Sequence, residues 1–188
     1  MKILAIVGSP RTKGNTNYLV DKALEEAAKS GMQTDKIILS QHDIRPCLGH
    51  DNCATLKSCA QHDDAPWILE RLCEADAVIL ATPVYWFNVT AQMKTFIDRN
   101  FFLYTHGIHP CAKAVGIIIV AECEGIEDTL NTLRIFTERT FPIPEDRIIN
   151  VTGYANKMGE AEANTSLVND TVALGKKLAE IIQQENSG

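Results

Sequence analysis

The chain has 188 residues, of which 45% are hydrophobic, and it carries a formal net charge of -6 with a pI near 5.4. This length suits one well-filled core, so we expect a single domain spanning residues 1–188. The acidic balance and the scattered Lys and Arg residues argue against nucleic-acid binding. No apolar run approaches the ~18 residues of a membrane span or suits a signal peptide, so we expect a cytoplasmic protein without a membrane partner.

Short apolar runs alternate with helical patterns along the whole chain. The runs predict five strands, at Lys2–Val7, Lys36–Leu39, Ala77–Ala81, Ala114–Val120 and Ile148–Val151. The third and fourth runs are almost continuously apolar, which is typical of parallel strands that are covered on both faces. We therefore predict an α/β fold, a doubly wound five-stranded parallel sheet with helices on both faces.

The segment after the first predicted strand has the composition of a phosphate-binding loop. It leads into a helical pattern that begins near Asn15, so backbone N–H groups and the helix dipole can hold a phosphate there. It matches neither Gly-x4-Gly-Lys-Ser/Thr nor Gly-x-Gly-x-x-Gly. Its hydrogen-bonding side chains suit a single terminal phosphate instead; they are Ser9, Arg11, Thr12, Asn15, Thr16 and Asn17. The alternative is an ordinary strand-to-helix turn capped by Asn15 or Thr16.

An irregular segment, residues 42–66, lies between the second predicted strand and the next helix. It is long for a loop in a compact domain, and such loops are commonly functional. Cys47, Cys53 and Cys59 fall within thirteen residues of it, together with His50. In a cytoplasmic chain we expect free thiols or metal ligands rather than disulfides. The other cysteines, Cys73, Cys111 and Cys123, are expected to be core or loop residues.

Three consecutive aromatic residues, Tyr85, Trp86 and Phe87, follow the third predicted strand. They cannot all enter one core, so at least one is expected to line an apolar slot or an interface. Packing on the sheet end or on a neighbouring subunit is the alternative. Ligands of open parallel sheets bind at the carboxyl ends of the strands. A phosphate loop beside an aromatic loop at that edge indicates a ligand with a phosphate and a flat body, as in flavin mononucleotide (FMN).

The two loops together carry a family resemblance. Gly8-Ser9-Pro10-Arg11 with Gly14-Asn15-Thr16, followed by the run from Thr82 to Arg99, resembles the NADPH-dependent FMN reductase family, which has a flavodoxin-like fold. The resemblance implies that FMN is held by Ser9, Arg11, Gly14, Asn15, Thr16 and Asn17 at its phosphate and by Pro83, Val84, Tyr85, Trp86, Phe87 and Asn88 along its ribityl chain and ring.

The same resemblance implies an enzyme that passes electrons from NADPH or NADH through FMN to a quinone, flavin or other acceptor. No catalytic side chain is expected, because the flavin supplies the chemistry. A homodimer or homotetramer is implied. The loop Ala121–Gly125 departs from the family pattern through Glu122 and Glu124, which either lower the reduction potential of the flavin by charge repulsion or point into solvent.

The spacing Cys47-x2-His50-x2-Cys53-x5-Cys59 resembles the four-cysteine motif of the iron–sulfur flavoproteins, a branch of that family, with a histidine at the second position. An iron–sulfur cluster, a zinc ion and no metal all remain open, and no metal ligand is assigned. Two other functions stay open with them. One is an iron–sulfur flavoprotein that acts as an electron carrier, and the other is a non-catalytic flavin- or redox-sensing protein.

Overall fold

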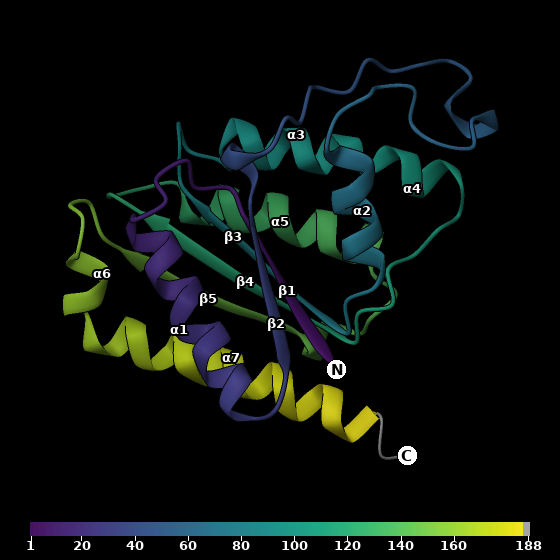
Figure 1. The fold of residues 1–188 in the computed structure, drawn as a ribbon. Helices are drawn as coiled ribbons and strands as arrows, with labels where there is room; N and C mark the ends of the chain where they lie inside the picture. Colours follow the sequence, from purple (N-terminus) through teal and green to yellow (C-terminus); the bar gives the residue numbers. More distant parts are fainter. Residues whose placement is uncertain (186–188) are drawn as a thin grey trace.

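The computed structural model describes residues 1–185 and contains the five-stranded parallel sheet that the sequence predicts, in the order β2-β1-β3-β4-β5 (Figure 1). The predicted frayed end at 186–188 lies outside the described residues. A single crossover from β2 back past β1 to β3 reverses the winding, which is the order of flavodoxin-like folds. The strands are β1 Lys2–Val7, β2 Gln33–Ile38, β3 Ala77–Pro83, β4 Ala114–Ala121 and β5 Ile148–Tyr154.

All five predicted strands are present, and the differences lie at their ends. The edge strand β2 begins three residues before the prediction, because the polar residues from Gln33 onward pair with β1 from Lys2 onward. The other edge strand, β5, continues past Val151 because its pairing with β4 extends to Tyr154. Polar edge strands are held by backbone pairing, so their ends do not show in apolar periodicity.

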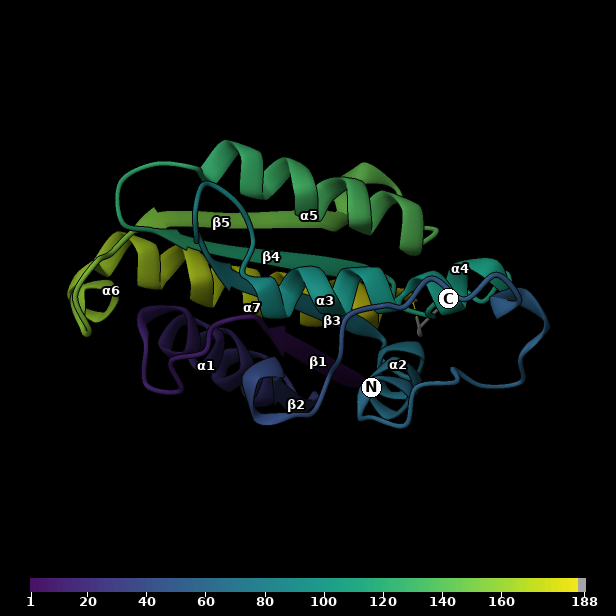
Figure 2. The ribbon, with the colours of Figure 1, turned by 90° about the horizontal axis from the view of Figure 1, so that it is seen from above.

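Helices cover both faces of the sheet (Figure 2). The long helices α1 and α7 cover one face with the short α6, and α2, α3, α4 and α5 lie on the other. Their bounds are α1 Asn15–Lys29, α2 Ala65–Cys73, α3 Ala91–Arg99, α4 Phe101–Thr105, α5 Ile126–Thr140, α6 Glu160–Ala163 and α7 Thr165–Glu185. Short 3-10 turns are η1 Leu39–Gln41, η2 Cys53–Thr55 and η3 Glu145–Arg147.

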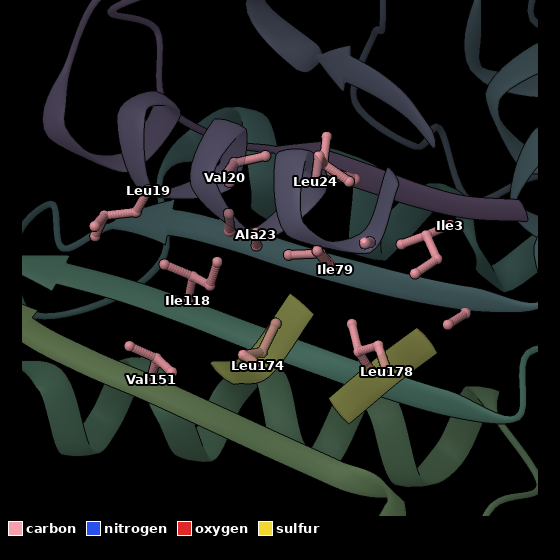
Figure 3. Close-up of a cluster of buried hydrophobic side chains, with 14 of the residues drawn as sticks. Ile3, Leu19, Val20, Ala23, Leu24, Ile79, Ile118, Val151, Leu174 and Leu178 are labelled. Carbon is pink, nitrogen blue, oxygen red and sulfur yellow. The ribbon is translucent and has the colours of Figure 1, made fainter. Parts of the chain in front are cut away.

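The core beneath α1 and α7 is formed by aliphatic side chains from the helices and from alternate strand positions (Figure 3). Ile79 and Ile118 on the central strands contact this layer, together with Leu174 of α7. The two helices approach each other closely at Gly175, where an added Cβ would lie 2.1 Å from the carbonyl oxygen of Ala23. Glycine is therefore required at this position for α1 and α7 to pack side by side.

The sequence pattern predicts a helix over Val89–Arg99, and the observed helix α3 begins two residues later, at Ala91. Thr90 is its N-cap, and the Thr90 side chain accepts a hydrogen bond from the Met93 N–H at 3.2 Å. The short helices α4 and α6 are not evident from periodicity, because they are only about one turn long. Within residues 1–185, no helix is both long enough and apolar enough to cross a membrane.

Candidate functional site

A cavity of about 460 Å³ opens at the carboxyl ends of the strands, the edge at which the sequence predicts ligand binding. Eight of the twelve predicted site residues line it: Ser9, Arg11, Gly14, Asn15, Thr16, Pro83, Val84 and Tyr85. Thr12, which the sequence places in the phosphate loop, also lines the cavity. The other lining residues were not assigned to the site from the sequence; they are Pro10, Lys13, Val120, Glu122, Ala155, Asn156 and Met158. The volume lies within the usual range of about 300–1,000 Å³ for small-ligand pockets.

The loop between β1 and α1 is held by its own polar groups. The carbonyl oxygen of Arg11 accepts hydrogen bonds from the Gly14 N–H at 2.9 Å and from the Asn17 side-chain amide at 2.9 Å. The Ser9 hydroxyl accepts a hydrogen bond from the Arg11 N–H at 3.3 Å. Asn17 is buried and does not line the cavity, so its observed role is to shape the loop.

The first turn of α1 faces this cavity without a side-chain cap. Gly14 is the N-cap and has no side chain to accept from the helix, and the first turn contains no acidic residue. The cap predicted as the alternative, on Asn15 or Thr16, is therefore not formed. Arg11 and Lys13 add two exposed positive charges at the same end of the helix. Uncapped N–H groups with nearby cations are what an anion such as a phosphate requires.

Asn15 links two loops that are distant in sequence. Its side-chain amide donates to the carbonyl oxygen of Lys157 at 2.9 Å, and its oxygen accepts from the N–H groups of Gly159 and Ala161 at 3.1 and 3.3 Å. The loop after β5 thereby becomes one wall of the cavity, with Met158 at the rim. The Asn15 side chain is engaged in this contact, so what it offers a ligand is its backbone N–H.

The loop between β3 and α3 is anchored against the end of β1. The Thr90 hydroxyl donates to the Gly8 carbonyl oxygen at 2.8 Å, and the Gly8 N–H donates to the Ala81 carbonyl oxygen at 2.7 Å. A Cβ at position 8 would lie 2.8 Å from the Thr90 hydroxyl and 2.9 Å from Met93. The absence of a side chain at Gly8 therefore lets the two loops that line the cavity lie next to each other.

The aromatic residues form a tight turn at the mouth of the cavity. Tyr85 and Asn88 exchange backbone hydrogen bonds at 2.9 and 3.2 Å, and the two residues between them, Trp86 and Phe87, have φ values of 48° and 63°. Left-handed backbone at two bulky residues is strained, and such strain is common at functional sites. Tyr85 lines the cavity, whereas Trp86, Phe87 and Asn88 do not, and Trp86 is 93% exposed.

The two glutamates after β4 have different surroundings. Glu122 lines the cavity, and its carboxylate accepts a hydrogen bond from the Asn156 side chain at 2.7 Å. Glu124 lies outside the cavity, in a surface depression with Phe87 and Gly125. Asn156 and its neighbours follow β5, so the rule that ligands meet the carboxyl ends of strands could have located them once the full length of that strand was known.

Residues 42–66, called the cysteine loop from here on, are attached to α3 by the buried Arg99. The Arg99 guanidinium donates to both carboxylate oxygens of Asp63, to the Arg45 carbonyl oxygen at 2.9 Å and to the Cys59 sulfur at 3.2 Å. Burial disfavours the Asp63 carboxylate, but the Arg99 contacts and two backbone N–H groups outweigh it and lower the pKa of Asp63 below its usual value. One side chain thus holds both ends of the loop.

The residues of the cysteine motif do not converge in this structure. The Cys59 sulfur accepts from Arg99 at 3.2 Å, and the Cys53 sulfur lies 3.9 Å from the Thr105 hydroxyl. Cys47 is exposed and lies beside a different cavity, next to Tyr104. Across residues 1–185, no three His, Cys, Asp or Glu side chains are grouped closely enough to hold a metal ion. The motif as placed therefore does not fit the four-ligand set of an iron–sulfur cluster.

Comparison with known proteins agrees with this fold. An iron–sulfur flavoprotein of Methanocaldococcus jannaschii is 33% identical over 97% of this chain and 98% of its own length. An iron–sulfur flavoprotein of Archaeoglobus fulgidus is 44% identical over 60% of this chain, which spans half of that relative's length. An NAD(P)H:quinone oxidoreductase from Methanothermobacter marburgensis superposes with a TM-score of 0.74 at 14% identity, covering 95% of this chain and 96% of that one.

The family comparison covers both ligand-facing loops described above. Residues 1–151 match the model of the NADPH-dependent FMN reductase family, a span that begins with β1 and ends within β5. The fold and family predicted from the two loops are confirmed. The chain therefore belongs to the NADPH-dependent FMN reductase family of flavodoxin-like oxidoreductases.

Proposed function

We propose that this chain is an FMN-dependent oxidoreductase that takes electrons from NADPH or NADH and passes them to a quinone or another small acceptor. The observation that carries the proposal is the uncapped N-terminus of α1, which faces a cavity of about 460 Å³. Family membership supports the flavin, and the solved NAD(P)H:quinone oxidoreductase with the same fold supports the fold alone.

We assign the phosphate end of FMN to the first turn of α1. The backbone N–H groups of Asn15 and Thr16 form the cradle, and the buried hydroxyls of Ser9 and Thr16 add hydrogen bonds. Arg11 and Lys13 balance the phosphate charge at the exposed side. The residues Pro83, Val84 and Tyr85 form the wall along which the ribityl chain and ring lie.

Bound FMN supplies the electron transfer, and the protein binds, orients and tunes it. Tyr85 and Val84 provide apolar surface for a flat ring, while Glu122 places a carboxylate in the same cavity. No side chain lining the cavity is required as an acid or base. The strained turn at Trp86 and Phe87 fixes the position of Tyr85 at the mouth.

The binding assignment is tested by replacing Thr16 with valine, which keeps the shape of the side chain and removes its hydroxyl. We expect Thr16→Val to weaken FMN binding about tenfold in equilibrium dialysis, because hydrogen bonds to charged groups contribute about 1.5–3 kcal/mol. Binding of riboflavin, which lacks the phosphate, should change little. Thr165→Val, at an exposed position on α7, is the matched control. An equal loss of affinity for FMN and for riboflavin would show that the Thr16 hydroxyl does not bind the phosphate.

The activity is tested on protein loaded with FMN. We expect oxidation of NADPH or NADH that depends on an added benzoquinone, and no oxidation by protein stripped of flavin. Failure to bind FMN would overturn the whole proposal, and binding without turnover would leave the non-catalytic flavin-sensing role as the better description. Because the cysteine motif as placed does not form a four-ligand site, we do not extend the iron–sulfur cluster of the relatives' names to this chain.

A further inference from the structure

Two cysteines lie next to each other at the amino-terminal edge of the sheet, the edge opposite the flavin cavity. Cys73 ends α2 just before β3, and Cys111 precedes β4. The Cys111 N–H donates to the Cys73 carbonyl oxygen at 3.5 Å. Two residues further on, the Lys113 N–H donates to the Asp76 carbonyl oxygen at 2.7 Å, and the parallel pairing of β3 with β4 begins there. The two segments therefore run side by side into the sheet.

This pairing places the two residues within the range of a disulfide bond. The regular spacing of about 5 Å between neighbouring strands begins a few residues later, where Ala77 pairs with Ala114. Disulfides join cysteines whose Cα atoms are about 4.4–6.8 Å apart. We expect contact between the sulfurs to need side-chain rotation with little movement of the backbone.

The two thiols differ in their surroundings in a way that suits a two-step reaction. Cys111 is exposed, and Cys73 is half-buried against a cavity of about 250 Å³. Burial, with the neighbouring Cys111 thiol and the carboxylates of Glu70 and Glu74, raises the pKa of Cys73 above its usual value. An oxidant in solution therefore meets Cys111 first, and Cys73 is placed to react second.

We propose that Cys73 and Cys111 are a modification site that forms a reversible intramolecular disulfide by exchange with a low-molecular-weight disulfide. The Cys111 thiolate attacks the small disulfide, which breaks its S–S bond, releases one small thiol and leaves a mixed disulfide on Cys111. The Cys73 thiolate then attacks the Cys111 sulfur and releases the second small thiol. In total two protein thiols are oxidised and one small disulfide is reduced to two thiols, which carry the two protons.

The other cysteines are less well placed to react with Cys73. Cys59 lines the same 250 Å³ cavity, but its sulfur accepts a hydrogen bond from Arg99 at 3.2 Å. Cys123 lies beyond the end of β4, at the flavin edge of the sheet. A bond between Cys73 and Cys111 closes a covalent loop around β3, α3 and α4, which contains the flavin-facing turn at Tyr85.

The site is tested by mapping disulfides in the full-length protein after treatment with oxidised glutathione, alkylation and tryptic digestion. Trypsin places Cys73 in peptide 72–94, Cys111 in 100–113, Cys59 in 58–71 and Cys123 in 114–134. We expect one species that joins peptides 72–94 and 100–113, and we expect dithiothreitol to reduce its amount about tenfold or more. The linked species should be absent from Cys111→Ser and retained in Cys123→Ser, both of which change exposed residues.

The mapping on unaltered protein decides the question without relying on the folding of a variant. Detection of the joined peptides supports the site. Glutathione bound to Cys111 without the joined peptides would overturn it, because Cys73 would then have failed to react. A joined species of peptides 58–71 and 72–94 would overturn it in favour of Cys59 as the partner of Cys73.

Discussion

Gly125 is the residue at which the loop after β4 approaches the turn that carries Tyr85. Its φ is 87°, and an added Cβ would lie 2.7 Å from the Phe87 Cα and 2.7 Å from a Val84 methyl group. Gly31 has a similar φ of 83°, but no atom lies within 4 Å of its Cβ position. Gly31 is therefore needed only for its left-handed backbone. Gly125 is needed both for its left-handed backbone and because a side chain would clash with Phe87 and Val84.

We expect Gly31→Ala to lower the free energy of unfolding by about 1 kcal/mol, the cost of left-handed backbone in an L-residue. Gly125→Ala should lower it further, by about 2–4 kcal/mol in total, because the clash with Phe87 adds to the backbone cost. It should also weaken FMN binding, since the turn that carries Tyr85 must move. Urea unfolding and FMN dialysis of both variants measure this. Equal losses of stability in the two variants would mean that the turn at Phe87 can move away from a side chain at position 125 without a further loss of stability.

Glu122 and Glu124 give a second comparison of two similar residues. Glu122 lines the cavity beside Asn156, whereas Glu124 lies outside it. A carboxylate near the ring disfavours the extra negative charge of reduced flavin by about 1 kcal/mol at intermediate distance and dielectric. We therefore expect Glu122→Gln to raise the two-electron potential of bound FMN by about 20 mV. Glu124→Gln should leave it unchanged, and equal shifts in a dye-linked titration would rule out a local effect.

Residue identity alone shows only part of this site. The hydroxyls, amides and glycines of residues 8–17 predict a phosphate loop, and eight of the twelve predicted residues line the cavity. Sequence reasoning could not show that the Asn15 side chain contacts the loop after β5, because that contact joins residues more than 140 positions apart. Long-range side-chain contacts depend on the folded sheet and leave no local pattern.

At the scale of the elements, the cysteine loop depends on one buried ion pair. Asp63 and Arg99 are both almost fully buried, and Arg99 connects α3 to both ends of the loop. Removing one partner of a buried ion pair lowers the free energy of unfolding by about 3–5 kcal/mol, because the other charge stays buried without a partner. We expect Asp63→Asn to lower the free energy of unfolding by about 3 kcal/mol at pH 7, with Asp43→Asn, which breaks an exposed pair with Arg45, as the matched control.

The pH dependence of this pair follows from the direction of the pKa shift. The pKa of Asp63 is lowered on folding, so its contribution is present above the unfolded value of about 3.9 and is lost as the pH falls through the folded value. The stability difference between the unaltered protein and Asp63→Asn should therefore shrink when unfolding is measured below pH 4. A difference that stays constant down to pH 2 would show that Asp63 acts through its shape and not its charge.

At the scale of the whole molecule, α1 and α7 form one of the two helical layers, and their contact depends on Gly175. A Cβ there would meet the Ala23 backbone at 2.1 Å, whereas a Cβ at Gly116 would meet only flexible leucine methyl groups, the nearest at 2.9 Å. We expect Gly175→Ala to lower the free energy of unfolding by about 3 kcal/mol or more, and Gly116→Ala to lower it by about 1 kcal/mol. Urea unfolding of both variants measures these changes. Similar losses of stability in the two variants would indicate that α1 and α7 can move apart without a loss of packing energy.

The architecture was largely predictable because the apolar runs of the central strands are continuous and the helices between them are amphipathic. The edge strands were placed less well, since β2 begins with Gln33 and Thr34 and has little apolar signal. The path of the cysteine loop was not predictable, because it is fixed by contacts between Arg99 of α3 and residues 36 to 54 positions away in the sequence.

The strained turn at the cavity mouth also determines how the protein can be observed. The chain contains two tryptophans, Trp67 and Trp86. The turn carries Trp86 into solvent beside the cavity at the carboxyl ends of the strands. Trp67 of α2 lies near His42, where the cysteine loop begins, with the ring centroids 5.4 Å apart and the ring planes tilted by 35°. Each indole is therefore a separate optical reporter. We expect emission from Trp86 to respond to occupation of the cavity, and emission from Trp67 to respond to the attachment of the cysteine loop.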